Sequence, residues 1–164
     1  MNTRKMTIAA MFIAVGVLSA HLVYIPVGFA KCFPVQHAIN VLLAVILGMR
    51  YAATSAFGIA LLRNLLGTGS IFAFPGSIIG AALSGYLYKK TNSLYGAIAG
   101  EVIGTGIIGG LLSYPIATYI MGSNVGAFFF VMPFLIRTIG GSTIAYVICK
   151  TPIKNVFEEF TRKV

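Results

Sequence analysis

The sequence predicts an all-α integral membrane protein built as a bundle of six transmembrane helices. The first observation is composition: 58% of the 164 residues are hydrophobic and only 9% are charged, whereas soluble domains carry about 25% charged residues. The second is the alternation of long apolar runs with short breaks that contain proline, glycine or basic residues. The third is that most basic residues lie at the ends of those runs, where membrane proteins carry their orientation signals.

Six apolar segments follow one another along the chain. Gly67 ends the third segment, and Pro75 begins the fourth at a first-turn position that tolerates a missing N–H. We expect helices at residues 6–25, 36–49, 51–66, 75–88, 94–121 and 125–150, which together form one transmembrane domain over residues 1–150. Residues 151–164 combine apolar and basic side chains and predict a cytoplasmic amphipathic tail on the membrane surface.

The basic residues predict the orientation. The chain has twelve Lys and Arg against three Asp and Glu, a net charge of +9. With both termini in the cytoplasm, nine basic residues are cytoplasmic: Arg4, Lys5, Arg50, Lys89, Lys90, Lys150, Lys154, Arg162 and Lys163. Only Lys31 is then external, while Arg63 and Arg137 lie within helices. Because cytoplasmic loops are enriched in basic residues, we expect both termini inside, and a lipid bilayer rather than nucleic acid as the partner.

Three of the expected helices are short. Crossing the ~30 Å hydrocarbon core takes about 20 residues, but the second, third and fourth segments have roughly 14 to 16 residues and reach about 21–24 Å. Basic residues hold their inner ends at the cytoplasmic surface, so the missing length falls on the outer side. Irregular backbone at that depth is tolerated where it lines a wet cavity. We therefore expect an outward-facing ligand pocket, lined or capped by residues 26–35 and 67–74.

Three ionisable side chains fall inside the expected helices: Arg63, Glu101 and Arg137. Counted from the cytoplasmic ends, both arginines lie about 20 Å deep and Glu101 about 12–13 Å deep. Two arginines around one carboxylate can form a structural salt bridge that joins the third, fifth and sixth helices. Alternatively, one arginine is free to donate hydrogen bonds to a ligand, because ionisable groups in membrane helices usually face a cavity or the bundle interior.

Gln36, His37 and Asn40 open the second helix at its outer end. His37 and Asn40 share one helical face, and these polar side chains either contact a ligand or cap the helix. No second histidine or carboxylate has metal-ligand spacing with His37, so we expect no metal site. The estimated depths separate His37 from Glu101 by most of the membrane, which argues against an enzyme that uses them together as acid and base.

Two further pairs are candidate cavity residues. Asn64 and Thr68 flank the turn after the third helix, where they either cap its last carbonyls or contact the ligand. Pro115 predicts a kink in the fifth segment that leaves Tyr114 and Tyr119 as possible cavity residues. In the sixth segment, two phenylalanines on the face of the buried arginine offer aromatic walls: Phe130 and Phe134.

Small residues recur on two segments. The fifth carries a glycine every four residues, a spacing that lets helix backbones approach closely in lipid: Gly96, Gly100 and Gly104. Ala10 and Ala14 form a smooth strip on the cytoplasmic half of the first helix. Internal packing explains such a strip, and a docking surface for another membrane subunit is the alternative.

Three stretches of this sequence resemble the ThiW family, which comprises thiazole-specific substrate-binding S components of energy-coupling factor (ECF) vitamin transporters. They are residues 33–41 (FPVQHAINV), residues 62–69 (LRNLLGTG) followed by FPGS at 74–77, and residues 100–109 (GEVIGTGIIG). The similarity extends over nearly the whole chain apart from the last dozen residues. Six helices, a small basic chain and an alanine strip on the first helix are also typical of S components.

The resemblance implies a protein of the prokaryotic plasma membrane that captures the thiamin precursor hydroxyethylthiazole from outside the cell. It implies that Ala10 and Ala14 dock onto a transmembrane coupling subunit and that two cytoplasmic ATPases drive uptake, so the chain itself is no enzyme and needs no cofactor. Other vitamin precursors, hydroxymethylpyrimidine or thiamin, remain alternative ligands. A stand-alone secondary transporter that cycles a proton on Glu101 is a further alternative, although no inverted repeat is visible. Two arginines exceed what a neutral ligand demands, which leaves a phosphorylated or carboxylated thiazole open.

Overall fold

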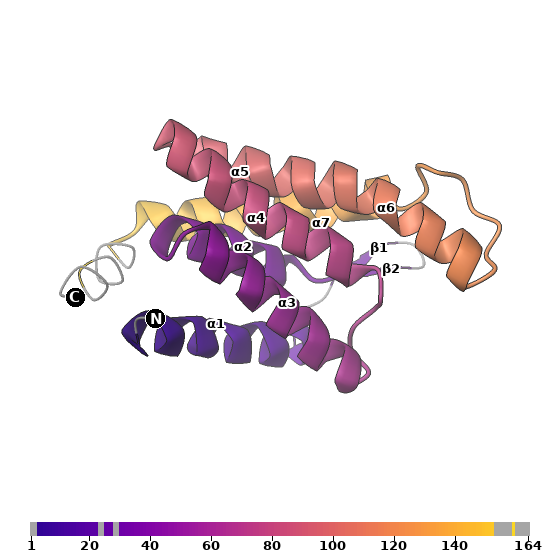
Figure 1. Ribbon diagram of the computed structural model, residues 1–164, viewed down its shortest axis with the longest axis horizontal. Helices are drawn as coiled ribbons and strands as arrows, with labels where there is room; N and C mark the ends of the chain where they lie inside the picture. The colour runs from indigo at the N-terminus through magenta and orange to yellow at the C-terminus, as the bar shows by residue number, and fades with distance from the viewer. Residues whose placement is uncertain (1–2, 23–24, 28–29, 153–158, 160–164) are drawn as a thin grey trace.

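The computed structural model describes residues 3–22, 25–27, 30–152 and 159, and these form an all-α bundle (Figure 1). Its α-helices are α1 (Thr3–Leu22), α2 (Pro34–Ile46), α3 (Met49–Leu65), α4 (Ala73–Thr91), α5 (Leu94–Glu101), α6 (Gly110–Pro115) and α7 (Val131–Lys150). The π-helical stretches η1 (Val102–Gly109) and η2 (Ile116–Ile120) continue α5 and α6, making one rod from Leu94 to Ile120. Strands β1 (Ile25–Val27) and β2 (Ala30–Cys32) form an antiparallel pair before α2. Most of the expected tail, residues 151–164, lies outside the described residues.

Three described segments are long and apolar enough to cross a membrane: Thr3–Ala20, Leu94–Ile120 and Val131–Lys150. α2 and α3 have only 13 and 17 residues, which corresponds to about 20 and 26 Å. The predicted all-α membrane bundle is confirmed, with two short helices beside longer apolar ones.

Two helices differ from their expected bounds. α4 has 19 residues and reaches about 28 Å, so it is not short. Pro75 lies in its first turn, where no N–H is needed, and the helix continues through two lysines that favour a helix C-terminus until Asn92, at φ 49°, ends it. α7 begins at Val131 rather than at residue 125, because Gly122 (φ 65°) turns the chain and residues 122–126 are irregular. Of the three helices expected to be short, only α2 and α3 are.

The helices alternate in direction, which gives the bundle two different ends (Figure 1). One end holds the start of α1, the α2–α3 and α4–α5 turns and the end of α7 (Figure 1). The described basic residues at these helix ends are Arg4, Lys5, Arg50, Lys89, Lys90 and Lys150. The opposite end holds the strand pair and the loops that follow α3 and η2 (Figure 1). We call these two ends of the bundle the basic end and the loop end.

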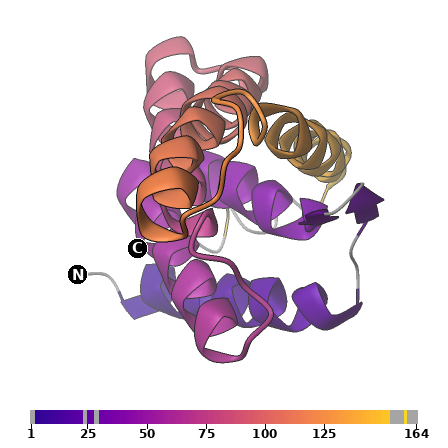
Figure 2. The ribbon, with the colours of Figure 1, turned by 90° about the vertical axis from the view of Figure 1, so that its right-hand side faces the viewer.

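α2 lies in the middle of the bundle (Figure 2) and contacts α1, α3, α4, α5 and α7. Eleven of its 13 residues are buried. One apolar cluster joins it to α1, α3 and α4 around Leu43 and Ile59, and a second joins it to α5 and α7 around Val41 and Ala145. Because neighbouring helices cover α2 almost completely, its first two turns can carry polar side chains without exposing them to hydrocarbon.

α4 and η1 pack closely because glycines face each other. A Cβ added to Gly104 would lie 2.6 Å from the Cα of Gly80, closer than real Cβ contacts come. A Cβ added to Gly80 would lie 2.8 Å from Oε2 of Glu101. These glycines therefore serve helix packing within the chain, and they leave room for the Glu101 carboxyl group between α4 and α2.

Candidate ligand-binding site

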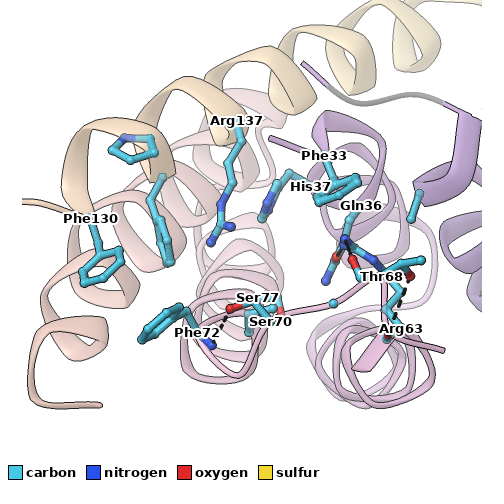
Figure 3. A pocket seen from close by; sticks show the side chains of 16 residues that line it. Phe33, Gln36, His37, Arg63, Thr68, Ser70, Phe72, Ser77, Phe130 and Arg137 are labelled. Atoms are coloured by element: carbon cyan, nitrogen blue, oxygen red, sulfur yellow. Dashed lines mark hydrogen bonds between the residues drawn. The ribbon is translucent and has the colours of Figure 1, made fainter. Parts of the chain in front are cut away.

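A cavity of about 560 Å³ opens at the loop end of the bundle, within the range of small-molecule sites. Figure 3 shows side chains that converge on it from α2, the turn after α3, α4 and α7. Its polar lining comprises Gln36, His37, Arg63, Thr68, Ser70, Ser77 and Arg137. Its aromatic lining comprises Phe33, Phe72, Phe130 and Phe134.

Arg63 joins the turn after α3 to the start of α2. Its Nη1 donates a hydrogen bond to Oε1 of Gln36, and its Nη2 donates to the Thr68 carbonyl oxygen at 2.9 Å. Its Cζ lies 3.9 Å from the centre of the Phe33 ring, in cation–π range. The side chain is only 4% exposed. Each terminal nitrogen of Arg63 therefore has one acceptor within the protein, while its Nε is buried without one.

The turn itself is closed by backbone and amide hydrogen bonds. The Thr68 and Gly69 amides donate to the Arg63 carbonyl oxygen at 2.9 and 2.8 Å, and Gly67 adopts φ 70°. Asn64 Nδ2 donates to the Ala60 carbonyl oxygen at 2.8 Å and to the carbonyl of Ser70 at 3.2 Å. Asn64 therefore closes the helix end, while Thr68 both closes the turn and lines the cavity.

Glu101 lies one layer behind the cavity wall, fully buried. Its Oε1 accepts hydrogen bonds from Asn40 Nδ2 at 3.1 Å and from Thr105 Oγ1 at 2.9 Å. His37 Nδ1 lies 2.8 Å from the same oxygen. Among the described side chains the ion pair of Glu101 is with His37, so of the two alternatives for the membrane arginines, the salt bridge to Glu101 is not formed.

The contact between His37 and Glu101 corrects the expected separation in depth. α2 is so short that His37 lies nine residues from its end at Ile46, and Glu101 lies seven residues from the start of α5 at Leu94. These spacings correspond to about 14 and about 11 Å, measured from the same end of the bundle. The start of α2 is therefore at mid-bundle depth, not at the outer surface.

His37 presents its second ring nitrogen to the cavity. Nδ1 is held by Glu101, and His37 is among the lining residues, so Nε2 is the nitrogen available to a ligand. When Nδ1 carries the proton and donates to Glu101, Nε2 of the neutral ring accepts a hydrogen bond. A carboxylate that holds the other nitrogen fixes both the tautomer and the ring orientation.

Arg137 reaches into the cavity from α7, beside His37 (Figure 3). Its Cζ lies 3.4 Å from the centre of the Phe134 ring. No hydrogen bond joins its guanidinium group to another described residue, and its Nε is buried without an acceptor. Phe130 stands beside it with Phe72, their ring centres 4.7 Å apart. Of the two membrane arginines, Arg137 is thus the one whose donors face the cavity unoccupied.

Five of the predicted ligand-binding residues do not line the cavity: Asn40, Asn64 and Glu101, which hold its surroundings, and two tyrosines that lie elsewhere. Neither Tyr114 nor Tyr119 lines the cavity, and Tyr119 is 82% exposed. The kink predicted at Pro115 was expected to leave both tyrosines near the cavity, but η1 and η2 insert π-helical turns, which change the angular spacing of side chains along the rod.

Several lining residues were not predicted from the sequence. Ser70 and Ser77 lie in the polar stretch after α3, and Phe33 precedes the proline that begins α2. Phe33 and Ser70 lie in the loops 26–35 and 67–74 that were expected to line or cap the pocket, although the individual side chains were not predicted. Phe72 lies in the loop 67–74 that was expected to line or cap the pocket, whereas Pro133 had no signal beyond being an apolar residue near a helix end.

Ala10 and Ala14 are exposed on α1, on the basic half of the helix. Gly16 instead packs inward, since a Cβ there would lie 2.7 Å from the Ile59 side chain. The alanine strip is therefore not used for packing within the described bundle.

Among the described residues, no cluster of three His, Cys, Asp or Glu side chains could hold a metal ion.

Comparison with known proteins gives one match. A family model described as thiamine-precursor transporter protein (ThiW) matches residues 6–154, which is most of the chain. No curated protein and no solved structure matches.

Proposed function

The chain belongs to the ThiW family of thiamine-precursor transporter proteins, and from this we propose that it is the membrane-embedded substrate-binding subunit of an ATP-driven ECF transporter. It captures hydroxyethylthiazole from outside the cell for uptake. The family is one of transporters, not of enzymes. The observation that carries the proposal is the cavity of about 560 Å³ at the loop end, lined on both sides by aromatic rings and polar side chains.

The lining suits a small flat ring with a polar substituent. Phe33, Phe72, Phe130 and Phe134 line the cavity, and Figure 3 shows Phe33 across from Phe72 and Phe130. His37 Nε2 and the Arg137 guanidinium group supply polar contacts between them. Apolar walls with a few convergent polar groups are typical of small-molecule sites.

The orientation of the cavity supports capture from outside. The charge pattern favours a cytoplasmic basic end, since basic residues concentrate in cytoplasmic segments. The cavity is lined by the turn after α3 and the start of α7, which lie at the opposite, loop end of the bundle (Figure 1). In this orientation both termini are cytoplasmic and the protein lies in the plasma membrane of a prokaryotic cell.

Partner subunits complete the transporter in this proposal. No nucleotide-binding motif occurs in the sequence, so two cytoplasmic ATPase subunits hydrolyse ATP. A transmembrane coupling subunit contacts the exposed strip formed by Ala10 and Ala14. Small exposed side chains on a membrane helix allow another helix to approach closely.

A proton-coupled secondary transporter is the rival class, and the buried pair of His37 and Glu101 is the observation in its favour. Uptake of labelled hydroxyethylthiazole by cells separates the two. We expect uptake only when the coupling subunit and both ATPases are expressed with this chain, and no loss on adding a protonophore. Uptake by the chain alone that a protonophore abolishes would establish the rival.

A further inference from the structure

We infer that the cavity takes a ligand with one negatively charged group, a carboxylate or a phosphate, and that Arg137 binds this group. The inference rests on the proposed function, because it specifies which form of the thiazole the same cavity prefers. It follows from three observations: unused donors, an unbalanced charge and the placement of aromatic rings.

The first observation is the difference between the two arginines. Arg63 donates to Gln36 and to the Thr68 carbonyl oxygen. Arg137 has no hydrogen-bond acceptor for any of its nitrogens among the described residues, whereas Arg63 lacks one at Nε but has one at each terminal nitrogen. The Arg137 side chain is partly buried, and leaving a charged group unpaired is costly both in a protein interior and within a membrane. Since no described residue accepts from Arg137, the acceptor of its donors comes from the cavity, as water or as a ligand group.

The second observation is the charge in and directly behind the cavity. Arg63 and Arg137 contribute two positive charges, and an ionised Glu101 contributes one negative charge. Glu101 is turned toward His37, Asn40 and Thr105 rather than toward an arginine. One positive charge thus remains uncompensated. A neutral alcohol accepts a hydrogen bond but leaves this charge, whereas a singly charged anion removes it.

The third observation is the position of the guanidinium group. Its Cζ lies 3.4 Å from the centre of the Phe134 ring, and none of its N–H groups has an acceptor among the described residues, so they are available for the parallel pair of hydrogen bonds that carboxylates and phosphates accept. Phe72 and Phe130 lie next to it and can hold a flat ring (Figure 3). A ligand with its acidic group at Arg137 thus places its ring against these phenylalanines.

Calorimetric titration of the purified full chain in detergent tests the inference. The ligands are hydroxyethylthiazole, its phosphate monoester and the carboxylate of the same ring, together with hydroxymethylpyrimidine and its phosphate. We expect at least one anionic thiazole to bind tenfold or more tighter than the alcohol, about 1.4 kcal/mol. The phosphate and carboxylate titrations show which anion is preferred. In Arg137→Gln the anion should lose its advantage, so that the anion and the alcohol bind with similar affinity.

Two variants serve as controls. Arg137→Lys keeps the charge without the planar pair of donors, so it should keep part of the preference, and it tests the site even where Arg137→Gln does not fold. Arg50→Gln removes a positive charge at the basic end, where Arg50 is exposed, and should change nothing.

The outcomes also separate this inference from the proposed function. Equal or tighter binding of the alcohol overturns the anion inference and leaves thiazole capture intact. Binding of the pyrimidines alone overturns the thiazole assignment. In that case, comparing the pyrimidine alcohol with its phosphate still shows whether Arg137 favours an anionic over a neutral ligand. Failure of every ligand to bind the folded protein overturns both.

Discussion

Arg63 and Arg137 have the same charge and similar depth, but their surroundings give them different roles. Arg63 holds the turn after α3 against Gln36 and Phe33. Arg137 rests on Phe134 with its donors toward the cavity. Arg63 is therefore a positioning residue for the cavity wall, and Arg137 is the proposed ligand contact.

Replacing Arg63 with lysine should loosen the cavity wall. Lysine keeps the charge but cannot donate from a planar fork to Gln36 and Thr68 together. We expect ligand affinity to fall about tenfold, or about 1.4 kcal/mol, measured by calorimetric titration. Arg50→Lys, at an exposed position at the basic end, is the matched control. Unchanged affinity in folded Arg63→Lys protein would show that the fork does not shape the site.

Asn40→Leu should destabilise the protein because Glu101 loses one of its donors. Asn40 Nδ2 donates to Glu101 Oε1 at 3.1 Å, and both residues are fully buried. Loss of one donor to a buried polar group costs about 1–3 kcal/mol, which thermal unfolding in detergent measures. Ser55→Ala is the control, since its buried hydroxyl has no partner and its removal should have little effect. Equal stability of the two variants would contradict this account of Glu101.

The sequence predicted which polar residues lie close together, but not which of these side chains contact each other. Gln36, His37, Arg63 and Arg137 all line the cavity. The contact of His37 with Glu101 was missed because depth was counted from an assumed outer end of the second helix. Pairing depends on where that helix ends relative to its neighbours, and local sequence does not specify such distances.

α2 is the element that makes the site possible. It is short and surrounded by other helices, so it brings Gln36, His37 and Asn40 to the middle of the bundle without contact with lipid. Its first turn supplies the floor of the cavity, and the turn after α3 supplies a side wall. A full-length second helix would fill this space.

The close packing of α4 on η1 should not tolerate a larger side chain. A Cβ at Gly104 would meet the Cα of Gly80 at 2.6 Å, so Gly104→Ala should push the helices apart. Overpacking typically costs about 1–3 kcal/mol, visible as a lower unfolding temperature. Gly126→Ala is the control, because nothing lies within 4 Å of a Cβ added there. If both variants unfold at the same temperature, this packing does not stabilise the bundle.

A bulky residue on the exposed face of α1 should separate binding from transport. Ala14→Trp adds volume where Ala14 is exposed, so ligand affinity should stay within twofold while uptake with the partner subunits is lost. Val147→Trp, at a 58% exposed position on α7, should preserve both. Loss of ligand binding in Ala14→Trp would mean that the strip supports the cavity rather than a partner.

For the whole molecule, the separation of the basic end from the loop end predicts the orientation. Single cysteines at Gly126 and Asn92, both exposed, lie at the loop end and the basic end. In a background without the native cysteines, a membrane-impermeant thiol reagent added to intact cells should label Gly126→Cys and not Asn92→Cys. The reverse pattern would place the cavity on the cytoplasmic side.

Composition and apolar runs predicted the fold class, because helices that cross the apolar interior of a bilayer must themselves be long and apolar. The expected bounds missed the length of α4 and the start of α7. A proline in a first turn does not show how many residues precede it, and the turn at Gly122 depends on a local φ of 65°. The π-helical stretches, which moved Tyr114 and Tyr119 off the cavity, have no periodic signal in a glycine-rich apolar run.

The most direct test is calorimetric titration of the purified wild-type chain, without partner subunits, ATP or an ion gradient. Hydroxyethylthiazole and its anionic forms are compared with hydroxymethylpyrimidine and thiamin. The account predicts binding of one thiazole per chain, in preference to the other two ligands. A folded protein that binds no thiazole, or that binds the pyrimidine or thiamin more tightly, would contradict it.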